Sequence, residues 1–213
     1  MDEDLSIINA NTRNEKIKNF FINNRKSLIG VLVVIILALC GYFFYEEFQT
    51  RQKAKLADQY NLAVNKYESG QKDVVDELRT IVNAKDSTYS PLAFYFLIDN
   101  NLVTSKEEIN QYFDLIINES GLDEETRNLN LFKKGLFNSD FANENELLGI
   151  LNPLIKSESI WKPHALYLMA EYYLANNQKQ KSKEFFELLA KLESASQKIK
   201  TEAQKRLRSD FSE

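Results

Sequence analysis

The pattern of apolar and polar positions divides the chain into two stretches of different character. Residues 28–45, LIGVLVVIILALCGYFFY, form eighteen consecutive positions without a charge, whereas 27% of the whole chain is charged. As a helix this run is about 27 Å long, close to the roughly 30 Å thickness of bilayer hydrocarbon. Twelve of its residues are Leu, Ile, Val or Phe, which together favour insertion by about 4–7 kcal/mol. The run therefore predicts a transmembrane helix.

The same run has the features of a retained anchor. A cleaved signal has a shorter apolar region of roughly 7–15 residues and small residues before its cleavage site, whereas this run ends in GYFFY. Lipoprotein processing requires a small residue before the cysteine, and here Leu39 precedes Cys40. We predict three parts: an N-terminal segment 1–27, the anchor 28–45, and a folded domain 46–213.

Charges beside the run predict its orientation. Because basic flanks stay on the cytoplasmic side, an excess before the run places the N-terminus in the cytoplasm. The inverted topology stays open, since the bias is five to three: Arg13, Lys16, Lys18, Arg25 and Lys26 before the run, and Arg51, Lys53 and Lys55 after it. Within the first segment, Ile17, Phe20 and Phe21 fit either a short interfacial helix or a disordered tail.

Beyond residue 45 the apolar residues recur with helical period and show no sustained alternation of the kind that predicts strands. Start signals agree with this pattern. Ser90 with Pro91 predicts an N-cap and first helical position. Ser105 with Glu108 predicts a capping box, and Asn143 with Glu146 a looser version of one. The sequence therefore predicts an all-α domain.

Two segments of this domain resemble each other. SPLAFYFLIDNN (90–101) aligns with KPHALYLMAEYY (162–173) at a separation of 72 residues, which is about two units of a helical hairpin repeat of some 34 residues. We predict an α-solenoid of about four helix pairs, with a C-terminal helix through Ile199, Ala203 and Leu207 covering the open end. A plain helical bundle remains the alternative.

The segment LMAEYYLANNQKQKSKEFFELL resembles a tetratricopeptide repeat, with Ala170 at the close helix contact and Phe186 in the core of the second helix. The whole layout is similar to the YfgM-like family of ancillary SecYEG translocon subunits. Two short stretches carry this resemblance: FFINNRKSL before the apolar run, and STYSPLA before the second pair.

The resemblance implies a location and partners that periodicity does not show. It implies a single-pass protein of the cell inner membrane with a periplasmic repeat domain. It also implies a place beside the SecYEG translocon, together with a membrane-anchored peptidyl-prolyl isomerase-like chaperone, where the domain receives exported polypeptides.

Composition argues against several other functions. The part after residue 45 has 22 basic and 27 acidic residues, which is no footprint for nucleic acid. The single cysteine, Cys40, lies in the apolar run, and the single histidine, His164, has no partner at catalytic or zinc-ligand spacing. We therefore expect no enzyme, no metal and no cofactor.

A binding role remains, and helical spacing indicates where. Tyr95 with Asp99, and Tyr167 with Glu171, form equivalent pairs four residues apart on the first helices of two repeats. In tetratricopeptide arrays this stripe lines the concave groove, with His164 in or beside it. Rings buried between repeats are the structural alternative. The predicted function is a chaperone-type binding accessory; the alternative is a scaffold for envelope assembly or division that recognises one folded partner.

Overall fold

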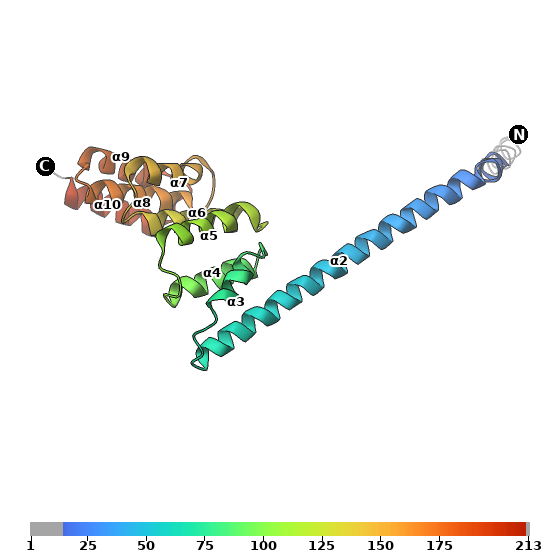
Figure 1. Cartoon of the computed structure of the whole chain (residues 1–213). Coiled ribbons are helices and arrows are strands. Elements are labelled where there is room, and N and C mark those ends of the chain that lie inside the picture. Colours follow the sequence, from blue (N-terminus) through green and yellow to red (C-terminus); the bar gives the residue numbers. More distant parts are fainter. Residues whose placement is uncertain (1–14, 212–213) are drawn as a thin grey trace, which may run out of the picture. The chain divides into compact units, whose positions relative to one another are not determined.

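The computed structural model describes residues 15–211, and every regular element in that range is helical (Figure 1). The predicted all-α fold, a long apolar helix followed by a repeat-like helical domain, is confirmed. Residues 15–23 are helical, and the further helices are α2 (Arg25–Glu68), α3 (Val75–Val82), α4 (Tyr89–Asp99), α5 (Lys106–Glu119), α6 (Glu124–Asn138), α7 (Glu144–Lys156), α8 (Lys162–Ala175), α9 (Lys179–Lys191) and α10 (Gln197–Asp210).

The chain separates into two compact units, residues up to Lys55 and residues from Leu56 onward. In the first unit, α2 is the one helix in the described part of the chain that is long and apolar enough to cross a membrane. All residues from 29 to 55 are exposed, because no other element among residues 15–211 covers them. Of the basic residues predicted to flank the run, Arg13 lies outside the described residues.

In the second unit the helices follow the order predicted for four pairs and a last helix. The C-terminal part of α2 precedes α3, and the pairs α4/α5, α6/α7 and α8/α9 follow before α10. Each helix from α3 onward packs against the next one along the chain. This neighbour-to-neighbour packing is what a stack of helical repeats produces.

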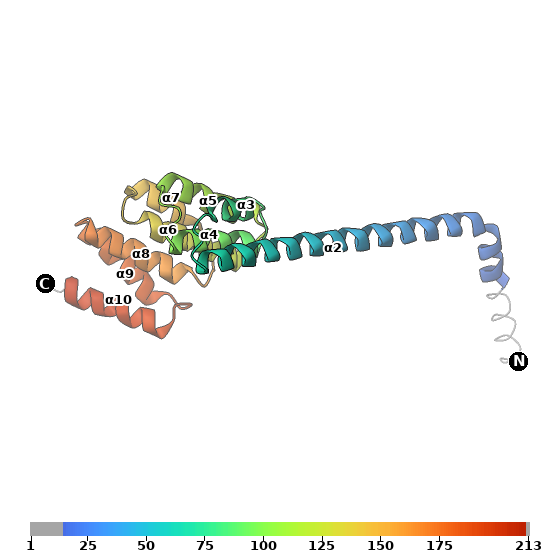
Figure 2. The same cartoon turned by 60° about the horizontal axis from the view of Figure 1, so that its bottom comes forward.

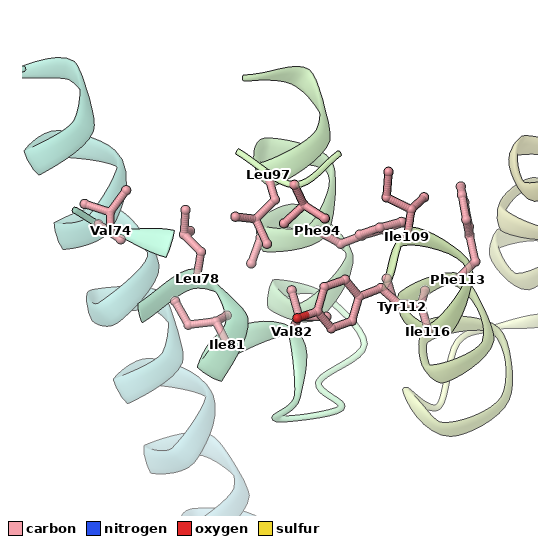
Figure 3. Close-up of a cluster of buried hydrophobic side chains, with 13 residues drawn as sticks. Val74, Leu78, Ile81, Val82, Phe94, Leu97, Ile109, Tyr112, Phe113 and Ile116 are labelled. Atoms are coloured by element: carbon pink, nitrogen blue, oxygen red, sulfur yellow. The ribbon is translucent and has the colours of Figure 1, made fainter. Parts of the chain in front are cut away.

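The core of the first two pairs is a continuous cluster of buried apolar side chains. Figure 3 shows side chains of α3, α4 and α5 pointing toward one another. The Phe94 ring is fully buried and meets the Phe113 ring edge to face, with 4.8 Å between centroids. Two further clusters hold the later helices, one centred on Leu151 of α7 and one on Phe186 of α9.

Two predicted N-cap residues, Ser105 and Asn143, are confirmed, but the capping box predicted at Ser105 is only half formed, because the Glu108 carboxylate binds Arg79 and Tyr112. Ser105 precedes α5, and its hydroxyl accepts a hydrogen bond from the Glu108 backbone N–H at 3.2 Å. Asn143 and Glu146 form the complete capping box at α7, since each side chain accepts a bond from the other's backbone N–H. These contacts satisfy backbone donors that a helix start otherwise leaves unpaired.

The predicted N-cap at Ser90 is wrong. Helix α4 begins at Tyr89, two residues before the predicted first position Pro91, and Ser90 is buried. Its hydroxyl donates to the Ile81 carbonyl at 2.9 Å and so ties α4 to the end of α3. The carboxylate of Asp86 instead accepts bonds from the N–H groups of Thr88 and Tyr89. A tertiary contact has therefore taken the hydroxyl that local sequence assigned to a cap.

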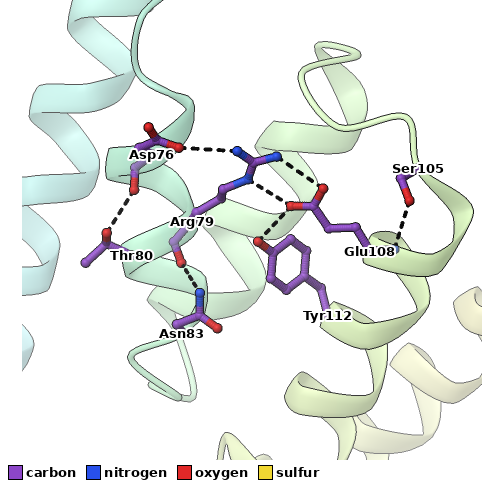
Figure 4. Close-up of polar contacts among 7 residues, drawn as sticks. All are labelled: Asp76, Arg79, Thr80, Asn83, Ser105, Glu108 and Tyr112. Atoms are coloured by element: carbon purple, nitrogen blue, oxygen red, sulfur yellow. Dashed lines mark hydrogen bonds and ion pairs between the residues drawn. The ribbon is translucent and has the colours of Figure 1, made fainter.

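A bidentate ion pair joins α3 to α5, as Figure 4 shows. Arg79 Nε lies 2.8 Å from Glu108 Oε1, and Arg79 Nη2 lies 3.1 Å from Oε2. The Tyr112 hydroxyl donates to the same carboxylate at 3.0 Å. Because two planar groups meet in fork geometry, this pair fixes the spacing of the two helices more closely than a single contact does.

Candidate functional site

The first helices of the four pairs carry an aromatic ring at equivalent positions. These rings, which we call the aromatic ladder, are Tyr60, Tyr95, Phe132 and Tyr167, separated by 35, 37 and 35 residues. Each ring contacts the next helix of this series; Tyr60, for example, lies 6.2 Å from the Tyr89 ring of α4. The ladder therefore spaces neighbouring first helices.

Tyr95 contacts α6 through both its hydroxyl and its ring. The hydroxyl donates to Asn130 Oδ1, and Lys133 Nζ lies 3.8 Å from the ring centroid. Burial, with a contribution from the Asp99 carboxylate, raises the pKa of Tyr95 above its usual value. Burial also lowers the pKa of Lys133, and Asp99 opposes that effect.

Phe132 forms the next step of the ladder, in a cluster of three rings. It stacks on Trp161 at 5.6 Å between centroids and meets the His164 ring at 5.8 Å. Trp161 and His164 are themselves 5.2 Å apart. Because His164 is exposed, this cluster presents an aromatic edge to solvent where α8 begins.

Tyr167 and Glu171 lie beside the last helix. Arg206 of α10 donates to Glu171 Oε2 at 2.9 Å and pairs with Asp210 at 3.3 Å. Burial raises the pKa of Tyr167. Helix α10 thus lies against this part of α8 in the way that the first helix of another repeat would. The predicted role of α10 as a cover for the last pair agrees with these contacts.

A pocket continues from α8 onto α10. Its volume is ≈ 420 Å³, and it combines aromatic, apolar and charged groups. Two of the predicted site residues line it, and the full lining is His164, Tyr167, Ser196, Lys198, Ile199 and Glu202.

A stripe of side chains flanks the ladder rings of α4, α6 and α8, three residues before and four residues after each of these three rings. We call it the first-helix stripe; it consists of Leu92 and Asp99 on α4, Leu129 and Leu136 on α6, and His164 and Glu171 on α8. Leu92 is 43% exposed and Leu136 is 52% exposed, although both are large apolar residues. The stripe therefore offers apolar contact area with charged groups at both ends.

All five predicted site residues fall on the ladder or the stripe, in two groups. Tyr95 and Asp99 lie on α4, while His164, Tyr167 and Glu171 lie on α8. Helix α6 stands between the groups, since it contacts α4 through Asn130 and α8 through Phe132. Whether these residues bind a partner stays a prediction.

Sequence reasoning missed the middle of the site, Phe132 and Leu136. The separation of 35 to 37 residues from Tyr95 and Tyr167 was the signal that could have found them. Helix α6 is hard to align because three of its buried positions carry asparagine in place of an apolar residue: Asn128, Asn130 and Asn138.

One comparison with known proteins bears on this architecture. Residues 18–108 match the family model described as a tetratricopeptide repeat-like domain. The chain thus carries such a domain. The match includes most of the first unit and the first two helix pairs up to the beginning of α5. No curated protein and no solved structure matches the chain.

Tetratricopeptide repeat-like domains bind other proteins and are typically not enzymes. The ladder and the stripe have the chemistry that such binding needs: rigid rings, exposed leucines and a few charges. Among residues 15–211 no group of three or more His, Cys, Asp or Glu side chains is placed to hold a metal ion.

Proposed function

We propose that this protein is a membrane-anchored binding protein whose first-helix stripe takes up a polypeptide segment. The observation that carries the proposal is the pair of exposed leucines, Leu92 and Leu136, held beside a row of partly buried rings. The rings are fixed by contacts to neighbouring helices, so a ligand would not have to order them on binding. Leucines flanked by Asp99 and His164 suit an apolar segment with polar or charged ends.

The apolar half of α2 would anchor the domain. Its exposed apolar side chains are covered by no element in the described part of the first unit, and a bilayer is the solvent that suits such a surface. The excess of basic residues before the run favours a cytoplasmic N-terminus, which places the repeat domain on the periplasmic side of an inner membrane.

Within this setting we propose an accessory, chaperone-type role at the SecYEG translocon, beside a membrane-anchored peptidyl-prolyl isomerase-like chaperone. The support is the resemblance of the premembrane stretch at 20–28 and of the stretch at 87–93. Both stretches lie inside the range that the family model matches. Exported polypeptides, which are unfolded and expose apolar segments, are the ligands that the stripe suits.

A scaffold that recognises one folded partner is the second candidate. It is favoured by the internal use of the polar groups: the Tyr95 hydroxyl bonds to Asn130, and Glu171 pairs with Arg206. Because these side chains already form hydrogen bonds and ion pairs within the domain, the surface is rigid. A rigid surface suits a single complementary partner better than many extended chains.

Site-specific photocrosslinking in intact membranes tests the proposal. A photoreactive amino acid replaces Leu136 of the stripe in one variant and Leu188 of α9 in the other. Leu188 is the matched control, because it is the same residue type with 56% exposure, against 52% for Leu136, but lies on a second helix. Captured proteins are identified by mass spectrometry.

We expect Leu136 to capture polypeptides several-fold more often than Leu188. Many different exported chains among the products would support the chaperone-type role, and one dominant folded protein would support the scaffold. Equal capture at the two positions, or no capture at either, would contradict a binding role for the stripe.

A further inference from the structure

The short helix before α2 has one apolar face that no other described element covers. Residues 15–23 are helical. Ile17, Phe20 and Phe21 are three and four residues apart and so share one face. Phe20 and Phe21 are 56% and 57% exposed. Large apolar side chains gathered in this way mark a surface that contacts another phase or molecule.

Cations border this face. Lys16 and Lys18 lie on either side of it by helical geometry, and both are exposed. Arg25 and Lys26 follow at the start of α2, while Glu15 is the one acidic residue between positions 15 and 45. An apolar face edged by lysine and arginine is the arrangement of helices that lie in a membrane interface with anionic lipid headgroups.

Asn24 separates this helix from α2. Its side-chain Nδ2 donates to the Phe20 carbonyl at 3.0 Å, the same carbonyl that accepts from the Asn24 backbone N–H. The amide thus caps the end of the short helix, and position 24 is a turn. Figure 2 shows the chain changing direction there before α2 begins. The apolar face is therefore free to lie along a surface instead of continuing the axis of α2.

We propose that residues 15–23 form an interfacial helix that, together with Arg25 and Lys26 at the start of α2, binds anionic phospholipid headgroups where α2 enters the bilayer. This inference rests on the proposed membrane span, because the bilayer is the surface next to the helix. Ile17, Phe20 and Phe21 would enter the boundary between headgroups and acyl chains. Lys16 and Lys18 would stay at phosphate level, since their long stems let the ammonium groups reach the interface.

Nitroxide scanning of the full chain in lipid vesicles tests the proposal. Cys40 is replaced by serine, and a single spin label is placed at residue 21 on the apolar face or at residue 19 on the opposite face. A third label at residue 34 reports the span. Vesicles consist of phosphatidylcholine alone or of equal parts phosphatidylcholine and phosphatidylglycerol, and collision with an aqueous nickel chelate measures exposure to water.

In phosphatidylglycerol vesicles we expect collision at residue 21 to be several-fold lower than at residue 19. The difference should shrink in phosphatidylcholine alone and in the double variant Lys16→Gln, Lys18→Gln. Equal collision at residues 19 and 21, with residue 34 protected, would overturn the inference and leave the proposed span intact. Full water exposure at residue 34 would overturn both. If the difference in collision between residues 19 and 21 is as large in phosphatidylcholine vesicles and in the double variant as it is for the parent chain in phosphatidylglycerol vesicles, the proposed role of headgroup charge is overturned.

Discussion

The two ends of helix α2 differ in composition and in the exposure of their apolar residues. From 29 to 45 every position is exposed and nearly all are apolar. From 56 to 67 most apolar residues lie on one side: Ala63 is buried and Tyr60 and Tyr67 are partly buried, whereas Asp58 and Asn65 face solvent together with Leu62, which is 55% exposed. The first arrangement suits a helix surrounded by lipid, and the second suits a helix packed on protein.

This difference shows that the exposure of one apolar residue does not by itself distinguish lipid contact from protein contact. In the apolar run, apolar side chains are exposed all around the helix, which is the pattern of a helix surrounded by lipid. In the described part of the repeat domain, exposed large apolar residues are scattered over a packed background, and Leu92 and Leu136 are the two that lie on the first-helix stripe. These two are the contact positions on which the proposed function relies. The following predictions test each half of this comparison.

The largest effect is expected from charge in the run. Changing Val34 and Ile35 together to aspartate should cost about 5–7 kcal/mol at the bilayer centre, which cancels the gain expected from the apolar side chains. The protein should then be lost from the membrane fraction that resists alkaline carbonate extraction. Val34→Pro is the control, because membrane helices tolerate proline, and it should stay largely in the membrane. Equal retention of all variants would contradict a lipid-facing helix.

A core substitution should have the next largest effect. Phe94→Ala removes a fully buried ring that packs on Phe113, and it should destabilise the repeat domain by about 3–5 kcal/mol. Urea unfolding of the detergent-solubilised chain, followed by circular dichroism, measures this loss. Leu92→Ala, two residues away and partly exposed, should shift the midpoint only slightly. Similar shifts for the two variants would mean that the assigned core is wrong.

Replacing two glycines by alanine should change the stability of the domain less, and in opposite directions for the two positions. A Cβ at Gly135 would lie 2.4 Å from Leu151 Cδ2, so Gly135→Ala must displace the fully buried Leu151 side chain of α7. We expect a net loss of about 1–2 kcal/mol, since overpacking outweighs the gain in helix propensity. Gly149→Ala meets nothing within 4 Å, and should stabilise the domain by roughly 0.5–1 kcal/mol. Stabilisation by both changes would refute the close approach of the two helices.

The smallest effect is expected from the ion pair between α3 and α5. Arg79→Gln removes both bonds to Glu108, and should cost about 1 kcal/mol or less because both groups are partly exposed. High salt should reduce the difference between variant and parent. Lys85→Gln, which breaks the more exposed pair with Glu119, should change the urea midpoint less. A larger loss for Lys85→Gln than for Arg79→Gln would contradict the importance of the bidentate geometry.

The sequence predicted the helical fold because local features determine it. The apolar period, the caps at Ser105 and Asn143, and the 72-residue correspondence are all visible along the chain. The start of α4 was misplaced because Ser90 bonds to Ile81, nine residues away. No local rule for helix starts contains that contact.

The candidate site was predicted only in part for a related reason. Tyr95 and Tyr167 belong to pairs that resemble each other, so alignment found them, whereas α6 buries Asn130 and Asn138 and departs from the pattern. Asn130 Oδ1 accepts a hydrogen bond from the Tyr95 hydroxyl. The side-chain amides of Asn138 and Asn110 each donate a hydrogen bond to the other. Polar residues that pair across helices hide a repeat from sequence comparison while preserving its packing.

The most direct test compares the two kinds of exposed apolar position within one experiment. Photoreactive residues at Val34 and at Leu136, 65% and 52% exposed in the isolated chain, are activated in the same intact membranes, and the adducts are identified by mass. We predict lipid adducts at Val34 and polypeptide adducts at Leu136. Polypeptide or water adducts alone at Val34, or lipid adducts alone at Leu136, would contradict the account.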